Sequence, residues 1–351
     1  MADTAQPIQP VPAVQLGNSG LRVSRLTLGT MNFGVPGRGH QGDWTLPIDA
    51  ARPIFAAAFD LGIFTFDCAD VYGLGACEEV VGQILRELQP RDQYVLATKI
   101  SMPLGPGANQ GGLSRKHVRE AIDASLRRLG VEYIDQLVIH RHPHGVPGHV
   151  AVPIEETLEA LHDAVRAGKV LYLGGSSMFA WQFAELQLTA KLNGWTRFIS
   201  MQNHHNLIYR EEEREMNPYC VSSGVGLMPW SPLARGILAG SYQGGFEAGS
   251  TSRSKGMDRA RTEGLYRGDA DFDIAARVGE VAGRLGATPA QVALAWLLAQ
   301  PGVASPVVGV SRIEQLQQLV GACHLTLEPQ DRAYLEELYR PLENLLSIGF
   351  S

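Results

Sequence analysis

The sequence predicts an α/β fold, a parallel (β/α)8 TIM barrel in one domain that spans residues 13–351. Short, nearly continuous apolar runs recur along the chain, each followed by a longer amphipathic segment, which is the pattern of parallel strands covered by helices. Eight such units follow one another without a reversal point, which favours a barrel over a doubly wound sheet. Because such a barrel takes about 250 residues, roughly 100 of the 351 residues remain for insertions and tails.

The predicted helices lie between the strands and carry start and stop signals. One begins at Thr45–Pro47 and ends at Asp60–Gly62. A second follows Ser114, runs to Leu129 and stops at Gly130, and a third runs from Thr157 to Val165 and leads to Ala167–Gly168. The eight predicted strands cover, in chain order, residues 26–30, 63–67, 94–99, 133–140, 170–174, 198–202, 226–230 and 305–308.

Three further segments complete the predicted layout. Residues 1–12 contain three prolines and few large apolar groups, so we expect a flexible N-terminal tail. Residues 236–273, rich in Gly, Ser and Arg, form an insertion directly after the seventh strand. Residues 285–311 carry no charge, but proline and glycine interrupt them, so we expect a buried helix over 289–299 and a buried strand rather than a membrane span.

The composition excludes several classes of partner. The formal charge is −6, from 30 Lys and Arg against 36 Asp and Glu, and binding to nucleic acid or to an anionic membrane requires a basic face. No secretory signal begins the chain. The four cysteines form no C-x-x-C pair, so we expect reduced thiols rather than a zinc site or a disulfide framework. These features predict a cytoplasmic protein without a metal.

Polar or aromatic residues end six of the predicted strands on the same side. Active sites of this fold lie at the C-terminal ends of the strands and on the loops that follow. The residues at these ends are Asp67, Lys99, His140, Ser176 with Ser177, Gln202 and Trp230. The sequence therefore predicts a functional site at this end of the barrel.

Asp67 and Lys99 lie on neighbouring predicted strands and can form an ion pair there. If Tyr72, one short turn beyond Asp67, points into the same space, Lys99 favours the phenolate and lowers the pKa of Tyr72 from about 10. Such a tyrosine can act as a general acid near neutral pH. Two histidine groups allow other interpretations: the cluster 140–144 with His149 as a metal site, and His204 with His205 as pocket lining or loop packing.

Several motifs, in this order, resemble those of the aldo-keto reductase superfamily. The resemblance extends from about Leu16 to Tyr339, and further phrases at 153–161 and 167–170 place the chain near the bacterial YajO-type reductases related to voltage-gated potassium channel β subunits. The motifs are Phe66-Asp67-Cys-Ala-Asp-Val-Tyr72-Gly73, Ala97-Thr98-Lys99, Leu137-Val-Ile-His140-Arg141, Gly174-Gly-Ser176-Ser177, Met201-Gln202-Asn203 and Pro229-Trp230-Ser231-Pro232-Leu233-Ala234.

The resemblance implies that NADPH reduces an aldehyde or ketone at a tetrad of Asp67, Tyr72, Lys99 and His140. Tyr72 would protonate the carbonyl oxygen, Lys99 held by Asp67 would tune Tyr72, and His140 would orient the carbonyl group. Channel β subunits often lack the histidine, so its presence here favours an enzyme over the alternative of a nucleotide-binding redox sensor with slow turnover. A third hypothesis keeps the fold but assigns sugar-phosphate or dehydrogenase activity.

The resemblance also implies cofactor contacts, with NADPH preferred and NADH weaker. Ser176, Ser177 and Gln202 match carboxamide contacts, and Trp230 matches the ring that stacks on the nicotinamide. Arg253, Lys255 and Arg312 are the candidates for holding a 2′-phosphate, and the insertion after the seventh strand would cover the cofactor. The remaining matched positions are Thr30, Met31, Asp67, Ser231, Pro232, Leu233, Arg235, Gly236, Gly309, Ser311, Gln315 and Gln318.

Substrate selectivity is expected from the variable loops around the open end. They contain Trp44 and Met102, which with Tyr72 and His140 predict an apolar, adaptable pocket for a small-molecule carbonyl substrate. No phosphate-binding cluster is evident in these loops, which favours neutral carbonyls, including bulky cyclic ketones and aromatic aldehydes. The relatives range from monomers to octamers, so a homo-oligomer is compatible with the sequence.

Overall fold

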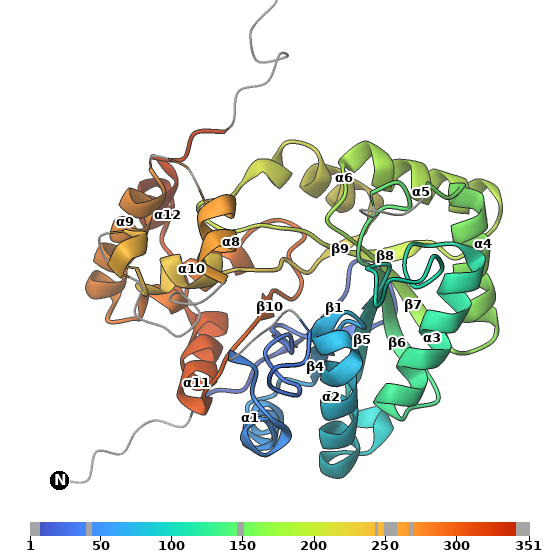
Figure 1. The fold of residues 1–351 in the computed structure, drawn as a ribbon. Coiled ribbons are helices and arrows are strands. Elements are labelled where there is room, and N and C mark those ends of the chain that lie inside the picture. Colours follow the sequence, from blue (N-terminus) through green and yellow to red (C-terminus); the bar gives the residue numbers. More distant parts are fainter. Residues whose placement is uncertain are drawn as a thin grey trace, which may run out of the picture.

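The computed structural model describes residues 8–39, 44–145, 151–242, 245–248, 258–266, 268 and 270–341. Eight parallel strands form one sheet in the order β10-β3-β4-β5-β6-β7-β8-β9, with helices around it (Figure 1). The strands are β3 (Thr27–Gly29), β4 (Thr65–Asp67), β5 (Val95–Ile100), β6 (Ile134–Ile139), β7 (Val170–Ser176), β8 (Phe198–Gln202), β9 (Gly226–Leu227) and β10 (Val307–Val308).

Backbone bridges join the two ends of this sheet. Leu227 pairs with Val303, and Trp230 pairs with Val307, both in parallel. The N–H of Ala304 donates to the carbonyl of Leu227 at 2.8 Å, and the N–H of Val307 donates to that of Pro229 at 2.8 Å. The sheet therefore closes through the segments that flank β9 and β10, and the predicted (β/α)8 barrel is confirmed.

The helices begin and end close to the predicted signals. The Ser114 hydroxyl caps α3 by accepting from the N–H of His117, and Gly130 ends it in the left-handed region at φ 66°. α4 begins at Ile154, three residues before the predicted start. The helices are α1 (Ile48–Asp60), α2 (Ala76–Leu88), α3 (Arg115–Leu129), α4 (Ile154–Arg166), α5 (Ala180–Leu192), α6 (Met216–Ser223), α8 (Asp258–Leu265), α9 (Asp271–Leu285), α10 (Pro289–Leu298), α11 (Ile313–Gly321) and α12 (Pro329–Glu336).

An N-terminal hairpin precedes the barrel. β1 (Ala13–Gln15) pairs antiparallel with β2 (Arg22–Ser24), and the N–H of Ser24 donates to the hydroxyl of Thr65 at 2.9 Å. Since Thr65 begins β4, the hairpin lies at the N-terminal end of the barrel strands. The chain is already held at Val11, which is buried and donates its N–H to Leu61, so the part of the predicted tail that is described is anchored at its end.

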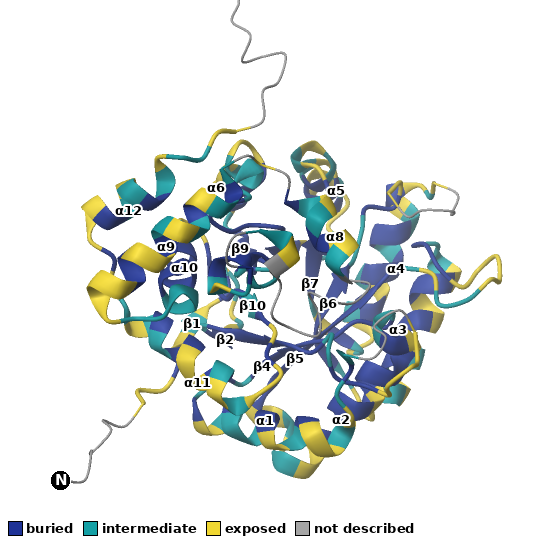
Figure 2. Cartoon of the chain, turned by 60° about the vertical axis from the view of Figure 1, so that its left-hand side comes forward, coloured by how far each residue is buried: buried dark blue, intermediate teal, exposed yellow. Residues whose placement is uncertain are grey.

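The core lies inside the barrel and between the strands and the surrounding helices (Figure 2). All residues of β3 to β6 are buried, as expected of parallel strands covered on the outside by helices. Phe55 of α1 stacks on Phe66 of β4, with 5.2 Å between ring centroids and 6° between planes. The uncharged α10 is buried from Val292 to Leu298, as the sequence predicts.

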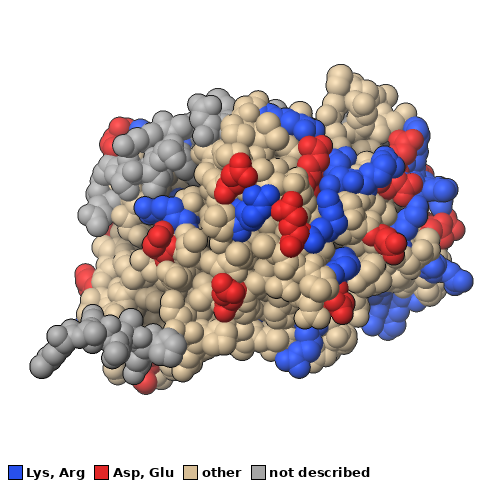
Figure 3. All heavy atoms as spheres, turned by 90° about the horizontal axis from the view of Figure 1, so that it is seen from below, with Lys and Arg blue, Asp and Glu red and all other residues tan. Residues whose placement is uncertain are grey.

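No helix in the described part of the chain combines the length and the apolar character needed to cross a membrane. On the face that Figure 3 shows, Lys and Arg side chains lie beside Asp and Glu side chains. Ion pairs include Arg52 of α1 with Glu87 of α2 at 2.9 Å, and Lys169, in the loop before β7, with Asp123 of α3 at 2.6 Å. Of the insertion 236–273, the described parts include a 3₁₀ segment over Ala234–Ala239 and α8.

Candidate active site

A buried ion pair lies at the C-terminal end of the barrel. The Lys99 ammonium donates to Oδ2 of Asp67 at 2.5 Å and to the carbonyl of Cys68 at 2.8 Å, and the two side chains are 1% and 3% exposed. Burial lowers the pKa of Lys99, but Asp67, Tyr72 and Cys68 together raise it above the ordinary value. Lys99 therefore remains an ammonium at any physiological pH.

Tyr72 approaches this pair from the turn that follows β4. Its hydroxyl lies 3.4 Å from Nζ of Lys99, and Leu74, two residues later, has a left-handed backbone at φ 51°. Burial raises the pKa of the Tyr72 phenol above its ordinary value, and the Lys99 ammonium offsets only part of this rise. The expected lowering of the Tyr72 pKa is therefore wrong in net direction, because desolvation of the phenolate is the larger effect.

His140 lies beside Tyr72 at the end of β6. The two rings are 6.1 Å apart and nearly perpendicular, at 81°. Burial, with the Lys99, Arg141 and Arg261 cations nearby, lowers the pKa of His140 well below its ordinary value. A neutral imidazole carries one N–H, so it can donate one hydrogen bond. Its Nδ1 is buried and has no hydrogen-bond partner within the described part of the chain.

Gln202 and Trp230 extend the site across the barrel end. The Gln202 side-chain N–H donates to Oδ1 of Asp67 at 2.9 Å, so Asp67 joins the Lys99 ammonium to β8. The indole N–H of Trp230 donates to the hydroxyl of Ser177 at 3.1 Å, and the Ser176 hydroxyl lies 3.2 Å from that of Ser177. The predicted residues thus form two contact groups at this end of the barrel: one around Asp67 and Lys99, and one of Ser176, Ser177 and Trp230.

The loop after Trp230 has an unusual backbone. Ser231, Ala234 and Arg235 have φ values of 52°, 49° and 55°, and Gly236 has a φ of 103°. Non-glycine residues with such strained backbone cluster at ligand sites, where the surroundings hold them in place. The guanidinium of Arg235 donates to the hydroxyl of Thr262 at 3.1 Å, which fixes this loop against α8. Pro232 is buried and Leu233 partly buried.

The other predicted cofactor positions differ in burial and in their contacts. Thr30 is fully buried and its hydroxyl donates to the carbonyl of Asp67 at 2.9 Å, so the hydroxyl is not open to a ligand. Gln315 accepts from the N–H of Ser311 at 2.8 Å, at the start of α11. Met31, Trp44 and Met102 are partly buried, Gly309, Arg312 and Gln318 are exposed, and Arg253, Lys255 and His149 lie outside the described residues.

These residues fit a nicotinamide dinucleotide. A ring such as nicotinamide needs a flat partner, and Trp230 is partly exposed with its N–H fixed by Ser177. The strained loop 231–236 begins directly after this indole, and exposed Gly309 has open space around its α-carbon on the neighbouring segment. No group of three or more His, Cys, Asp and Glu within the described residues could hold a metal ion.

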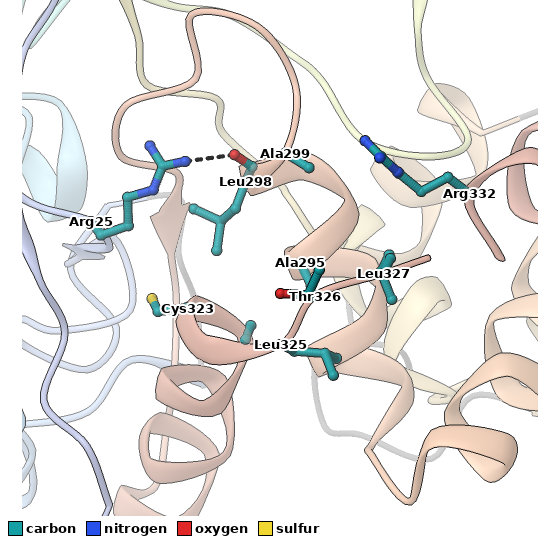
Figure 4. A pocket seen from close by; sticks show the side chains of 10 residues that line it. Arg25, Ala295, Leu298, Ala299, Cys323, Leu325, Thr326, Leu327 and Arg332 are labelled. Carbon is teal, nitrogen blue, oxygen red and sulfur yellow. Dashed lines mark hydrogen bonds between the residues drawn. The ribbon is translucent and has the colours of Figure 1, made fainter. Parts of the chain in front are cut away.

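The pocket in Figure 4 lies elsewhere. It is lined by Arg25, which precedes β3, and by residues of α10 and the segment 322–327. The Arg25 guanidinium donates to the carbonyls of Leu298 at 2.6 Å and Ala304 at 3.0 Å. Arg25 comes before β3, and Leu298 and Ala304 come before β10, so the pocket lies toward the N-terminal end of these strands. It contains none of the predicted site residues.

Two further groups support the site: Glu78, which was not predicted, and His204, which was predicted only as pocket lining or loop packing. Glu78 of α2 is fully buried and accepts from Thr98 at 2.6 Å and from Arg128 at 2.7 Å, which fixes α2 behind the Tyr72 turn. His204 stacks on Trp230. A buried Glu in an amphipathic helix and a histidine pair after a strand are weak signals, because neither reveals its partners until the strands and helices are packed.

A parallel barrel whose C-terminal end gathers an ammonium, a phenol and a neutral imidazole is the arrangement of an enzyme with acid–base chemistry. The comparison with family models gives the family: the aldo/keto reductase model matches residues 25–340, and the chain belongs to this family. Its members are oxidoreductases that act on carbonyl or alcohol groups.

Several similar proteins are fungal. A protein of Schizosaccharomyces pombe named "Putative aryl-alcohol dehydrogenase" is 43% identical, over 93% of this chain and 95% of its own length. Versiconal hemiacetal acetate reductase of Aspergillus parasiticus is 42% identical, over 93% of this chain and 96% of its own length. An aldo-keto reductase of Metarhizium robertsii is 41% identical, over 94% of this chain and 92% of its own length. The bacterial YajO-type branch stays a prediction.

Proposed function

We propose that this protein is an NADPH-dependent reductase that converts an aldehyde or ketone to the alcohol, with Tyr72 as the general acid. One observation carries the proposal: the Tyr72 hydroxyl lies 3.4 Å from a Lys99 ammonium that is itself paired with buried Asp67, and the His140 ring lies beside it. A proton donor, a fixed positive charge and a neutral hydrogen-bond donor thus share one end of the barrel.

The chemistry follows from the charges of these groups. Bound NADPH would supply a hydride from its nicotinamide to the carbonyl carbon. The Tyr72 phenol transfers its proton to the carbonyl oxygen and becomes a phenolate, which later regains a proton from water. Lys99 stabilises the negative charge as it develops, because a fixed charge in a poorly solvated site acts more strongly than in water. Neutral His140 donates to the carbonyl oxygen and orients it.

Raised pKa values suit this direction of reaction. A general acid must be protonated before the reaction, and burial keeps the Tyr72 phenol protonated at neutral pH. Asp67 keeps Lys99 charged, so the ammonium is present when the phenolate forms. The burial that raises the Tyr72 pKa therefore supports the role of general acid, although it opposes the lowering expected from Lys99 alone.

The preference for NADPH rests on cations that can hold a 2′-phosphate. Arg312 is exposed at the start of α11, close in sequence to exposed Gly309, and is available for this role. We propose that Arg253 also holds the 2′-phosphate, because the resemblance to aldo-keto reductases implies that its segment covers the cofactor. NADH lacks the phosphate and would bind more weakly.

The substrate in this proposal is a neutral, small-molecule carbonyl compound, aromatic aldehydes and bulky ketones included. The names of the fungal relatives, with aryl alcohols and a hemiacetal acetate among them, support this class. Trp44 and Met102 remain the proposed apolar contacts. We place the enzyme in the cytoplasm, without a nucleic-acid or membrane partner, and a homo-oligomer is compatible with this function.

The test is cofactor absorbance with NADPH and with NADH against a panel of aldehydes and ketones, run in both directions, beside Tyr72→Phe. We expect substrate-dependent NADPH consumption that Tyr72→Phe abolishes. A wild-type protein that binds NADPH yet reduces nothing on the panel would favour a nucleotide-binding sensor. Consumption that persists in Tyr72→Phe would remove the proposed acid.

A further inference from the structure

Three aromatic rings lie in one stack behind the candidate cofactor site. The His204 imidazole lies 4.1 Å from the indole of Trp230 with 9° between planes, and 4.1 Å from the ring of Tyr209 with 16° between planes. His204 and Trp230 are also bridged through their backbones, and the N–H of Trp230 donates to the carbonyl of Asn203 at 2.9 Å. The stack is thus built on the packed ends of two barrel strands.

Hydrogen bonds fix the imidazole in its plane. Its Nε2 lies 2.8 Å from the hydroxyl of Tyr266, and the Asn206 amide N–H donates to that hydroxyl at 3.2 Å. Burial, with His205 and Arg235 nearby, lowers the pKa of His204 to about 3, so the ring is neutral. An amide N–H can only donate, and the Tyr266 hydroxyl that accepts it can in turn donate to Nε2 of His204.

The same network holds the residue after Trp230. The Asn206 amide also donates to the carbonyl of Ser231 at 2.9 Å, where the backbone turns into the left-handed region. The indole of Trp230 is therefore fixed on one face by His204, at its N–H by Ser177 and at its following residue by Asn206. Trp230 is partly exposed, and since His204 covers one face of the indole, a planar ligand can stack only on the opposite face.

We propose that His204 is a positioning residue: it holds the plane of Trp230 so that the free indole face is preset to stack on the nicotinamide ring. This inference rests on the proposed function. The chemical link is direct, because a ring that is already oriented loses less freedom when a second ring stacks on it. Tyr266, directly after α8, fixes His204 in turn, so the described end of the insertion supports the nicotinamide site.

The experiment separates the nicotinamide end of the cofactor from the rest. Dissociation constants are measured for NADP+ and for 2′-phospho-ADP-ribose, which lacks the nicotinamide ring. The ratio of the two constants reports the contribution of that ring. The variants are His204→Leu, which removes the stack, and His204→Phe, which keeps a ring but loses the bond to Tyr266.

His205→Leu is the matched control. His205 is equally buried on the same segment, but its ring lies against Trp296 at 5.6 Å and bonds to Glu213, outside the stack. We expect its loss to disturb packing nearby and to leave the stack of His204 on Trp230 in place. Any general loosening of the segment would therefore show in both leucine variants.

We expect His204→Leu to weaken NADP+ binding by about 2- to 10-fold, the scale of one aromatic stacking contact, and to leave 2′-phospho-ADP-ribose binding unchanged. In His204→Phe the ratio of the two dissociation constants should stay close to that of the wild-type protein, and in His205→Leu it should not change. Equal weakening of both ligands by His204→Leu, or no change in either, would overturn the inference. A wild-type protein that binds neither ligand would instead refute the proposed function.

Discussion

Replacing Lys99 with methionine removes one partner of the most deeply buried ion pair described in the structure. The Asp67 carboxylate then stays in place at 3% exposure without its ammonium. Removal of one partner from a buried pair costs about 3–5 kcal/mol. Because the Gln202 N–H still donates to Asp67 at 2.9 Å, we expect the lower part of this range, about 3 kcal/mol of the free energy of unfolding.

Urea denaturation at pH 7 measures this loss, and two further variants make the result decisive. Lys169→Met removes an ammonium that bonds Asp123 at 2.6 Å but is 44% exposed, so it should cost less than about 1 kcal/mol. The double variant Asp67→Asn with Lys99→Met removes both charges, so it should be less destabilised than Lys99→Met alone. The reasoning is refuted if Lys99→Met costs no more than Lys169→Met, or if the double variant is at least as destabilised as Lys99→Met alone.

Three other predictions concern pH, packing and the cofactor. The kcat/KM for carbonyl reduction should stay constant from pH 6 to 9 and fall only above, because the active form of Tyr72 is protonated and its pKa is raised above about 10; a fall centred near neutral pH contradicts this. Gly82→Ala should lower the free energy of unfolding by about 1–3 kcal/mol in urea denaturation, because the new Cβ would clash with the carbonyl of Leu129. Gly279→Ala, at a position in α9 with open space, should raise it by about 0.5–1 kcal/mol. Similar effects of the two variants would rule out this clash. Arg253→Ala should raise the KM for NADPH and leave that for NADH nearly unchanged, and equal effects on both cofactors would exclude a phosphate contact.

The barrel could be predicted because its signals are local. An apolar run such as 134–139 marks a strand, and Ser114 and Gly130 mark the two ends of α3. The hairpin of β1 and β2 was not predicted, because three-residue strands with mixed exposure show too little periodicity. Its stability comes from contacts with the barrel, such as that between Ser24 and Thr65, which no local pattern reveals.

Some features of the candidate site could also be predicted from the sequence, and others depend on contacts in the folded chain. Asp67, Lys99 and His140 could be placed together because neighbouring parallel strands bring their C-terminal ends together. The net direction of the Tyr72 pKa could not be predicted, since it depends on how much of the phenol the packed loops remove from water. The stacking role of His204 could not be predicted either, because its partners Tyr209, Trp230 and Tyr266 come from three separate segments of the chain.

The central claim is that hydride from the cofactor and a proton from Tyr72 convert a carbonyl group to an alcohol at this end of the barrel. Transfer from NADPH that carries two deuterium atoms at C4 of the nicotinamide to an aromatic aldehyde, followed by mass spectrometry of the product, tests it most directly. The claim predicts an alcohol with one deuterium from the wild-type protein and almost none from Tyr72→Phe in the same time. An unlabelled alcohol, or equal labelling by Tyr72→Phe, would contradict it.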